Sequence, residues 1–252
     1  MLDRLFSPFE RILVDEVVAQ GARNILDIGC GAGAASLAIA EQLKDGGACT
    51  GVDISQALVD VACRRAAAAK TNARFLCADA QRYNFAPNQY DAIVSRFGVM
   101  FFDDPVSAFA NMRSAARLGA MLSCIVWRGA SDNPFMATQH HAIADVLGSQ
   151  AHPDPHAPGQ FAFADDERVR DILAEAGWGA IEIQPITVPC ELPTGELPVY
   201  ARRMGGIEAI LPDLDEVQSL RLQVALDAGF ARFVDDGVVR FDAACWMVHA
   251  RK

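Results

Sequence analysis

The residues with the clearest chemical potential are glycines near the start of the chain, in the run Ile25-Leu26-Asp27-Ile28-Gly29-Cys30-Gly31-Ala32-Gly33. The apolar stretch Asn24–Ile28 predicts a buried strand that enters a tight turn at these glycines. Glycine lets the backbone bend and approach a ligand without interference from a Cβ atom. The helix that follows begins with unpaired N–H groups facing that ligand. Asp27, at the end of the strand, is expected to accept hydrogen bonds from the loop and hold its shape.

Two more aspartates follow predicted strands. Asp53 comes 20 residues after Gly33 at the end of the predicted strand Cys49–Ile54, where a carboxylate can accept hydrogen bonds from both hydroxyls of a ribose. Asp79 follows the predicted strand Arg74–Cys77 and places an acid beside the position expected for an adenine. Each feature also has a plain structural interpretation, as a tight turn, a turn aspartate or a helix cap. The glycines fit the dinucleotide pattern G-x-G-x-x-G/A as well, so the pattern indicates a nucleoside ligand without choosing among them.

Four segments carry a family resemblance: ILDIGCGAG, GVDIS, CADAQ and YDAIVSRFGVMFFDDP, in that order. They resemble the class I S-adenosyl-L-methionine (SAM)-dependent methyltransferases, in particular the ubiquinone/menaquinone-biosynthesis-like (type 11/25) small-molecule group, over residues 24–127. The resemblance implies methyl transfer from SAM to a small-molecule acceptor, with S-adenosyl-L-homocysteine as the product. It also implies an α/β, doubly wound, mostly parallel seven-stranded sheet of order 3-2-1-4-5-7-6, with the last strand antiparallel and helical lid insertions.

The resemblance further implies where the cofactor lies. The methionine part would lie over the loop 29–33, the ribose on Asp53, and the adenine by Asp79 and Ala80. Residues 95–97 would lie beside the sulfonium and the acceptor. The expected cofactor-binding residues are Asp27, Gly29, Cys30, Gly31, Gly33, Asp53, Ile54, Asp79, Ala80, Ser95 and Arg96.

The elements that position these residues alternate between strand and helix, which implies a mostly parallel sheet covered on both faces. The remaining predicted strands are Asp91–Ser95, Met121–Trp127, Ile181–Val188 and Val238–Val248. We expect a single domain over residues 1–252 with its SAM-binding core at 22–127. Residues 128–164 and 189–236 interrupt the alternation, and such insertions at strand ends are where lids and substrate walls lie. The first insertion is expected to hold a helix over Pro134–Leu147 with Asn133 as its N-cap.

Aromatic residues near the predicted strand ends are the candidates for contact with the acceptor. The expected set is Phe97, Met100, Trp127, Phe135, Tyr200 and Arg203. Methyl transfer depends mainly on holding the nucleophile in line with the activated methyl group, and only a phenol, hydroxyl or ammonium acceptor requires a base. His140 is the candidate for that base, although a histidine on an apolar stripe is more often a packed core residue. His152 and His156 lack a third ligand at useful spacing, so no metal site is expected.

The net charge and the cysteine content restrict the kinds of partner and compartment that we expect for this protein. The chain of 252 residues has a formal net charge of −10, which repels phosphate backbones and anionic lipid headgroups, so nucleic acid and membrane surfaces are not expected partners. The start, Met1-Leu2-Asp3-Arg4, lacks the basic and apolar parts of a signal peptide, and no apolar run is long enough for membrane insertion. Seven cysteines without a CxxC pair indicate reduced thiols in a cytoplasmic protein.

Two other functions are compatible with a glycine loop followed by strand-end aspartates. A NAD(P)-dependent reductase of the short-chain type needs Tyr-x-x-x-Lys, and none of Tyr83, Tyr90 or Tyr200 has a lysine four residues on. A non-catalytic SAM-binding regulatory protein would carry the same binding motifs. The plentiful aromatic residues around the expected acceptor site favour turnover. The acceptor, the methylated atom and the oligomeric state stay open at this point.

Overall fold

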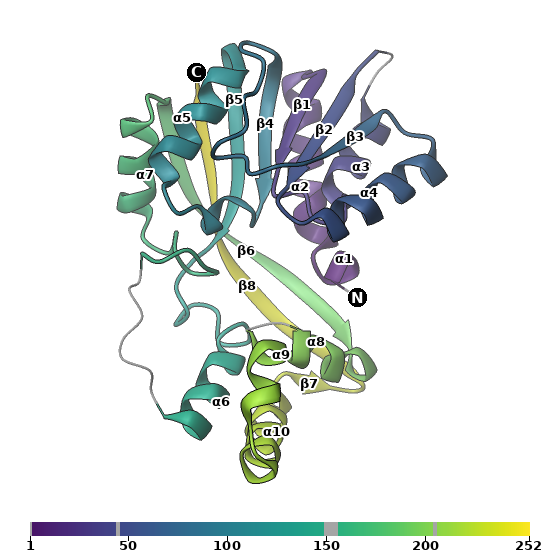
Figure 1. The fold of residues 1–252 in the computed structure, drawn as a ribbon, viewed down its shortest axis with the longest axis vertical. Helices are drawn as coiled ribbons and strands as arrows, with labels where there is room; N and C mark the ends of the chain where they lie inside the picture. Colours follow the sequence, from purple (N-terminus) through teal and green to yellow (C-terminus); the bar gives the residue numbers. More distant parts are fainter. Residues whose placement is uncertain (1, 44–45, 149–155, 204–205) are drawn as a thin grey trace.

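A single mixed β-sheet with helices on both faces forms the upper part of the molecule (Figure 1). The computed structural model describes residues 2–43, 46–148, 156–203 and 206–252. The strands are β1 (Asn24–Ile28), β2 (Ala48–Asp53), β3 (Ala73–Cys77), β4 (Tyr90–Arg96), β5 (Ala116–Trp127), β6 (Gly179–Pro193), β7 (Val234–Asp235) and β8 (Val238–Arg251). The helices are α1 (Leu2–Leu5), α2 (Ser7–Gln20), α3 (Ala34–Gln42), α4 (Gln56–Ala69), α5 (Pro105–Ala115), α6 (Thr138–Leu147), α7 (Asp166–Glu175), α8 (Leu197–Arg203), α9 (Ile207–Ile210) and α10 (Glu216–Ala231).

The strand order confirms the predicted topology. The sheet runs β3-β2-β1-β4-β5-β8-β6, and the two-residue strand β7 pairs with β8. Strands β1 to β5 pair in parallel, whereas β8 is antiparallel to both β5 and β6. When β7 is set aside, β8 is the seventh strand, so the order is the predicted 3-2-1-4-5-7-6 with one antiparallel strand.

Helices on both faces of the sheet explain why the two central strands β1 and β4 contain continuous buried runs. Helices α2 and α3 contact each other behind the sheet in Figure 1, and α5, which packs against α7, lies in front of it. Residues 25–28 of β1 and 92–95 of β4 are buried without the alternation of a half-exposed strand. Two of the helices begin at side-chain caps: Ser55 accepts from the Leu58 N–H, and Asp104 accepts from the Ser107 N–H.

A second, lower lobe is built on the projecting ends of two strands. The pairing of β6 with β8 continues from Gly179↔Arg251 to Pro193↔Val238, whereas β5 pairs with β8 only as far as Trp127↔Cys245. The outer part of the β6–β8 hairpin therefore extends below the sheet, where α6, α8, α9 and α10 gather around it (Figure 1). Helix α6 packs on α10, so the segments 128–164 and 189–236 meet in this lobe.

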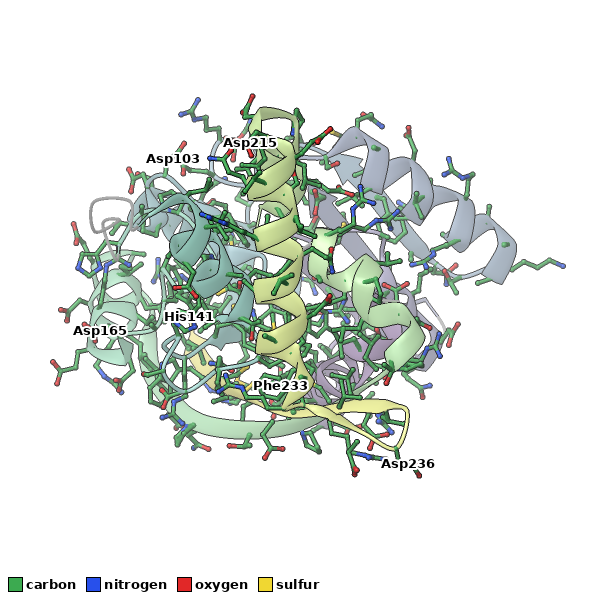
Figure 2. All side chains as sticks on the ribbon, turned by 90° about the horizontal axis from the view of Figure 1, so that it is seen from below. Asp103, His141, Asp165, Asp215, Phe233 and Asp236 are labelled. Carbon is green, nitrogen blue, oxygen red and sulfur yellow. The ribbon has the colours of Figure 1, made fainter. Side chains whose placement is uncertain are left out.

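Aromatic side chains form the core of the lower lobe. Phe135 stacks on Phe241 of β8, with ring centroids 3.8 Å apart and an interplanar angle of 9°. Tyr200 lies 5.1 Å from the Phe135 ring, and both residues are fully buried. Figure 2 shows α10 crossing this lobe from Asp215 towards Phe233, whose ring also contacts Phe135. Phe135 and Tyr200, which are predicted to contact the acceptor, therefore lie in this core of rings, where they bury the apolar faces of the hairpin and its helices.

The segment before α6 also differs from its prediction. The expected helix Pro134–Leu147 begins only at Thr138, and Asn133 is not its N-cap. The Asn133 amide instead pairs with the backbone of Ala244, donating to the carbonyl at 2.8 Å and accepting from the N–H at 2.9 Å. The ladder between β5 and β8 ends at Cys245, and the Ala244 carbonyl also accepts from the Arg128 N–H at 3.1 Å. The Asn133 oxygen provides the acceptor for the buried Ala244 N–H and ties the first insertion to β8.

Candidate functional site

The loop after β1 depends on glycine at its closest approach to a second loop. Gly29 and Gly31 have φ angles of 69° and 56°, a region that other residues rarely adopt. A Cβ atom added to Gly29 would lie 2.5 Å from the Cα of Gly98, and one added to Gly98 would lie 2.5 Å from the Ile28 carbonyl oxygen. Nothing lies within 4 Å of a Cβ built on Gly31, so its backbone faces open space. The loop after β1 and the loop after β4 are therefore in close backbone contact. The loop after β1 also has an open side at Gly31, where a ligand could approach.

Two polar residues that were predicted to bind the cofactor are instead buried beneath these loops. Asp27 accepts a hydrogen bond of 2.5 Å from the hydroxyl of Ser36 in α3, not from the loop. Complete burial raises the pKa of the Asp27 carboxyl to about 6, and the Ser36 hydrogen bond opposes that rise. Ser95 donates to the Ile28 carbonyl at 2.8 Å and accepts from the Gly98 N–H at 3.1 Å. Both side chains hold the loops in place, and neither lines a cavity.

Asp53 and Asp79 stand at the carboxyl ends of β2 and β3, as predicted. Asp53 accepts from the Gly31 N–H at 2.8 Å and from the Ser55 N–H at 2.9 Å, so it joins the end of β2 to the glycine loop. Asp79 accepts from the Gln81 N–H at 2.9 Å and caps the turn after β3. Each carboxylate keeps further lone pairs for a ligand, since an ionised carboxylate offers about four acceptor sites.

A cavity of about 300 Å³ lies at these strand ends, and we call it the strand-end cavity. The predicted cofactor residues in its wall are Gly29, Asp53, Ile54, Asp79, Ala80 and Arg96. The wall also contains Ile28, Val52, Ala78, Phe97, Gly98, Phe101 and Phe102. The predicted residues outside this wall are Asp27, Cys30, Gly31, Gly33 and Ser95. Gly33 has a packing role, because a Cβ atom there would come within 2.7 Å of the Phe75 ring.

The N-terminal helices form one side of the site, which the sequence pattern did not reveal. Arg96 donates from one guanidinium nitrogen to the Phe6 carbonyl at 3.3 Å and to the Glu10 carboxylate at 3.2 Å. Burial raises the pKa of the Glu10 carboxyl, and the nearby Arg96 cation opposes that rise. Arg96 and Glu10 lie 86 residues apart in the chain, so the sequence gives no signal for their ion pair.

A second cavity, of about 370 Å³, lies next to the first, and we call it the aromatic cavity. Its lining residues are Phe6, Phe97, Met100, Phe101, Trp127, Met136, His140, Gln160 and Gly206. These lining residues include no carboxylate, lysine or arginine. Phe97 and Phe101 line both cavities, so they mark the junction between them. Arg203, predicted to contact the acceptor, is exposed at the end of α8 and lines neither cavity.

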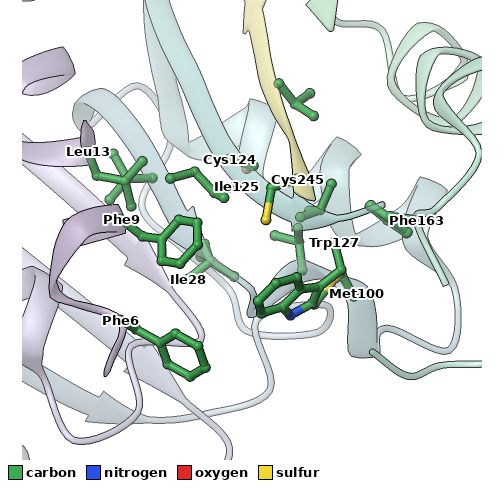
Figure 3. Close-up of a cluster of buried hydrophobic side chains, with 14 of the residues drawn as sticks. Phe6, Phe9, Leu13, Ile28, Met100, Cys124, Ile125, Trp127, Phe163 and Cys245 are labelled. Carbon is green, nitrogen blue, oxygen red and sulfur yellow. The ribbon is translucent and has the colours of Figure 1, made fainter. Parts of the chain in front are cut away.

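A stack of rings holds the junction. Phe97 lies flat on Trp127, with centroids 4.4 Å apart and an interplanar angle of 7°. Phe6 and Phe9 present their edges to the Phe97 ring at 5.5 and 5.0 Å, and Figure 3 shows both beside Trp127. Phe97 has a φ angle of 64°, a conformation that costs a bulky residue on the order of 1–3 kcal/mol and that clusters at functional sites. The surrounding rings and the bond from the Phe97 N–H to the Ile125 carbonyl (2.9 Å) keep it there.

His140 lies at the rim of the aromatic cavity, where its ring faces Phe161 with centroids 6.1 Å apart. Burial of its inner side lowers the pKa of the imidazole below the ordinary 6.5, so the ring is neutral at neutral pH. His152 lies outside the described residues. Among the residues that are described, no group of three histidine, cysteine, aspartate or glutamate side chains could hold a metal ion. No helix in those ranges is long and apolar enough to cross a bilayer.

Comparison with known proteins points to one family. A family model described as a methyltransferase domain matches residues 25–119. Demethylmenaquinone methyltransferase of Renibacterium salmoninarum is 24% identical over 181 residues, which cover 69% of this chain and 73% of that protein. Aklanonic acid methyltransferase DauC of a Streptomyces species is 31% identical over 107 residues, which cover 42% of this chain and 49% of that protein. The crystal structure of the YcgJ protein from Bacillus subtilis has a TM-score of 0.64 and 17% identity, covering 96% of this chain and 97% of that one.

The matched residues 25–119 contain the glycine loop and both strand-end aspartates, which are the parts that surround the strand-end cavity. The sheet has the order that the family resemblance implied, with a single antiparallel strand. Residues 25–119 therefore match a methyltransferase domain, and motifs, topology and family model together support a class I SAM-dependent methyltransferase.

Proposed function

We propose that this methyltransferase methylates a neutral, aromatic small molecule bound in the aromatic cavity. The observation that carries the proposal is the junction at Phe97 and Phe101, where the aromatic cavity meets the strand-end cavity. Uncharged, ring-lined walls favour a flat apolar ligand without net charge. Two of the relatives are named for acting on demethylmenaquinone and aklanonic acid, which supports a small-molecule acceptor.

The strand-end cavity fits SAM by the chemistry of its wall. Asp53 has lone pairs left for the ribose hydroxyls, and Asp79 with the Ala80 N–H lies where an adenine edge would bind. The exposed backbone at Gly31 leaves room for the methionine part. When bound, SAM supplies a methyl group that is already activated by a positively charged sulfur. The residues of this chain then only have to bind, orient and shield the reactants.

Positioning is the main task of the aromatic cavity. A nucleophile held about 3–3.5 Å from the methyl carbon and in line with its leaving group gains most of the available acceleration. The stack of Phe97 on Trp127 provides a flat, rigid surface against which an aromatic acceptor can lie. Phe6, Met100 and Met136 complete the apolar wall and exclude water. His140 at the rim is a neutral imidazole that can accept a proton from a hydroxyl acceptor.

We assign the parts of the chain according to which of the two cavities they line. Residues 22–127 supply the strand-end cavity, and the insertions 128–164 and 189–236 supply the outer wall of the aromatic cavity through Met136, His140, Gln160 and Gly206. Seven free cysteines in a chain of net charge −10 support a cytoplasmic enzyme that does not bind nucleic acid.

The proposal is tested by incubating the protein with SAM that carries an isotope label in its methyl group. A library of neutral oxygenated aromatic compounds is compared with the same ring systems bearing a carboxylate or an ammonium group. We expect label to appear in neutral aromatic products, with the loss of rate in Asp53→Ala as the control for the cofactor site. Labelling confined to charged or aliphatic acceptors would contradict the proposed acceptor class.

A further inference from the structure

Two of the three tryptophans of the chain donate a hydrogen bond from the indole N–H to a backbone carbonyl, and the third does not within the part of the chain that the structure describes. Trp178 donates to the Phe109 carbonyl at 2.9 Å, and Trp246 donates to the Ala164 carbonyl at 2.8 Å. Trp127 is only 3% exposed, yet no described residue accepts a hydrogen bond from its indole nitrogen. A buried tryptophan usually finds a partner for this group. Trp127 lines the aromatic cavity, so a bound ligand is the partner that its position leaves available.

Another donor on the same wall is not available to a ligand in this way. The side-chain nitrogen of Gln160 has no acceptor among the described residues, but it is closed off from solvent and so does not open on the cavity. The aromatic cavity therefore combines apolar walls with one indole N–H, that of Trp127, for which the protein itself offers no acceptor among the described residues. A donor left without a partner carries a desolvation cost, which a ligand oxygen would remove.

We infer that the acceptor carries at least one ring oxygen substituent, a carbonyl or phenolic oxygen, that accepts a hydrogen bond from the Trp127 indole. The Trp127 ring lies flat on Phe97, so its N–H points in one fixed direction and selects where on the ring the oxygen stands. Trp127 thus determines specificity. The inference rests on the proposed function, because it concerns the acceptor that fills the same cavity.

An oxygen-free ring of the same shape would leave the Trp127 donor unpaired in a water-poor cavity. A site built to hydrogen-bond a ligand rejects the analogue that lacks the partner, because the buried donor is then stranded. From the cost of one unsatisfied buried donor, we expect about a tenfold preference for the oxygenated ligand.

The test uses 1-tetralone and tetralin, which share a fused ring and differ by one carbonyl oxygen. Each is titrated by calorimetry into protein saturated with S-adenosyl-L-homocysteine, so that the strand-end cavity is filled. Wild type should bind 1-tetralone about tenfold more tightly than tetralin. Trp127→Phe keeps a ring to stack on Phe97 but lacks the donor, so its two affinities should become nearly equal. Its affinity for tetralin and for S-adenosyl-L-homocysteine should stay close to that of wild type, which shows that the variant is folded.

Two matched controls separate a cavity donor from donors elsewhere. Trp246→Phe removes an indole that is bonded within the protein, and it should keep the preference for 1-tetralone. Gln20→Leu removes another side-chain nitrogen that is buried and unpaired but lies outside both cavities, and it should keep the preference too.

The outcomes distinguish the inference from the proposed function. Equal binding of 1-tetralone and tetralin by wild type, or a preference that survives in Trp127→Phe, would overturn the role of the indole donor and leave the aromatic acceptor in place. Failure of both compounds to bind, while S-adenosyl-L-homocysteine binds, would overturn the aromatic acceptor and the donor role together.

Discussion

The strand-end cavity and the aromatic cavity share two residues, yet they are built in opposite ways. The first takes its wall from residues 28–102, at the ends of successive parallel strands, and uses backbone groups and two aspartates. The second draws on Phe6, Trp127, Gln160 and Gly206, which come from both lobes and from the N-terminal helices. A site of the first kind is encoded by local motifs, whereas a site of the second kind exists only once distant segments have packed together.

The two cavities should therefore respond differently to substitution. Changes at the strand ends remove specific hydrogen bonds and affect binding of the cofactor. Changes in the lower lobe act first on packing, because the lobe depends on one cluster of aromatic rings around Phe135.

The largest effect is expected for Phe135→Ala. Removing a fully buried phenylalanine that stacks on Phe241 should lower the free energy of unfolding by about 3–5 kcal/mol, because transfer and cavity costs add. Urea unfolding measures the change, and Phe101→Ala, which removes an exposed ring at the junction, is the comparison. A Phe135 variant of normal stability and a raised acceptor KM would restore this residue to the acceptor site.

Asp53→Ala tests the strand-end cavity, and it should weaken binding of the cofactor. Charge-assisted hydrogen bonds are worth about 1.5–3 kcal/mol each, so SAM should bind roughly 10- to 1,000-fold more weakly. The empty protein should also lose about 1–2 kcal/mol of stability, since Asp53 accepts from the N–H groups of Gly31 and Ser55. Asp60→Ala, at an exposed position on α4 whose carboxylate accepts a hydrogen bond from the Gln56 side chain, is the control for both measurements. Normal SAM affinity in Asp53→Ala would remove Asp53 from the cofactor site.

Asp27→Asn tests whether Asp27 acts on the stability of the protein, as its burial indicates, and not on binding of the cofactor. The folded-state pKa of about 6 lies above the ordinary 3.8, so the folded protein holds the proton more tightly and loses stability as pH rises through that interval. Above the interval, the uncharged amide should stabilise the protein by up to about 3 kcal/mol and still accept the Ser36 hydrogen bond. Unfolding of both proteins at about pH 5 and about pH 8 gives the difference, which should grow with pH. A difference independent of pH would show that Asp27 is not protonated on folding.

The smallest effect is expected for His140→Ala. Catalysis that rests on positioning should lose less than about 100-fold in kcat, the lower end of what removal of a general base costs. Because burial lowers the pKa of His140, a titration of this residue would appear below its ordinary value of 6.5, as a loss of rate towards acid pH. The pH profile of the variant should match that of wild type. A loss of about 1,000-fold together with disappearance of the acidic limb would make His140 the catalytic base.

Much of the fold was predictable because the parallel strands are short apolar runs bounded by glycine and aspartate. Strand β1 matches its prediction to the residue, β2 begins and ends one residue earlier than predicted, and β3 begins one residue earlier. The prediction for β6 stopped at Val188, whereas the strand runs to Pro193. The predicted strand already contains Pro185, and the observed strand continues through Pro189. Because β6 is the edge strand next to β8, prolines are tolerated there.

The candidate site was predictable only where its residues are close in sequence. Asp53, Asp79 and Arg96 line the strand-end cavity as predicted, because the carboxyl ends of parallel strands meet at one edge of the sheet. Gln160 and the ion pair of Arg96 with Glu10 depend on contacts between segments far apart in the chain, which a single sequence does not reveal. An aromatic residue in an insertion has the same pattern whether it lines a cavity or fills a lobe, and for this reason Phe135 was misplaced.

The division into two cavities is tested most directly by titrating SAM, S-adenosyl-L-homocysteine and NADH into wild type, Asp53→Ala and Met136→Trp. Met136 lies in the wall of the aromatic cavity alone, so a larger side chain there should block the acceptor and leave the cofactor unaffected. We expect SAM and its product to bind wild type and Met136→Trp with the same micromolar affinity, Asp53→Ala to bind both more weakly, and NADH to give no heat. Binding of NADH without binding of SAM, or weakening of SAM by Met136→Trp as large as that by Asp53→Ala, would contradict the account.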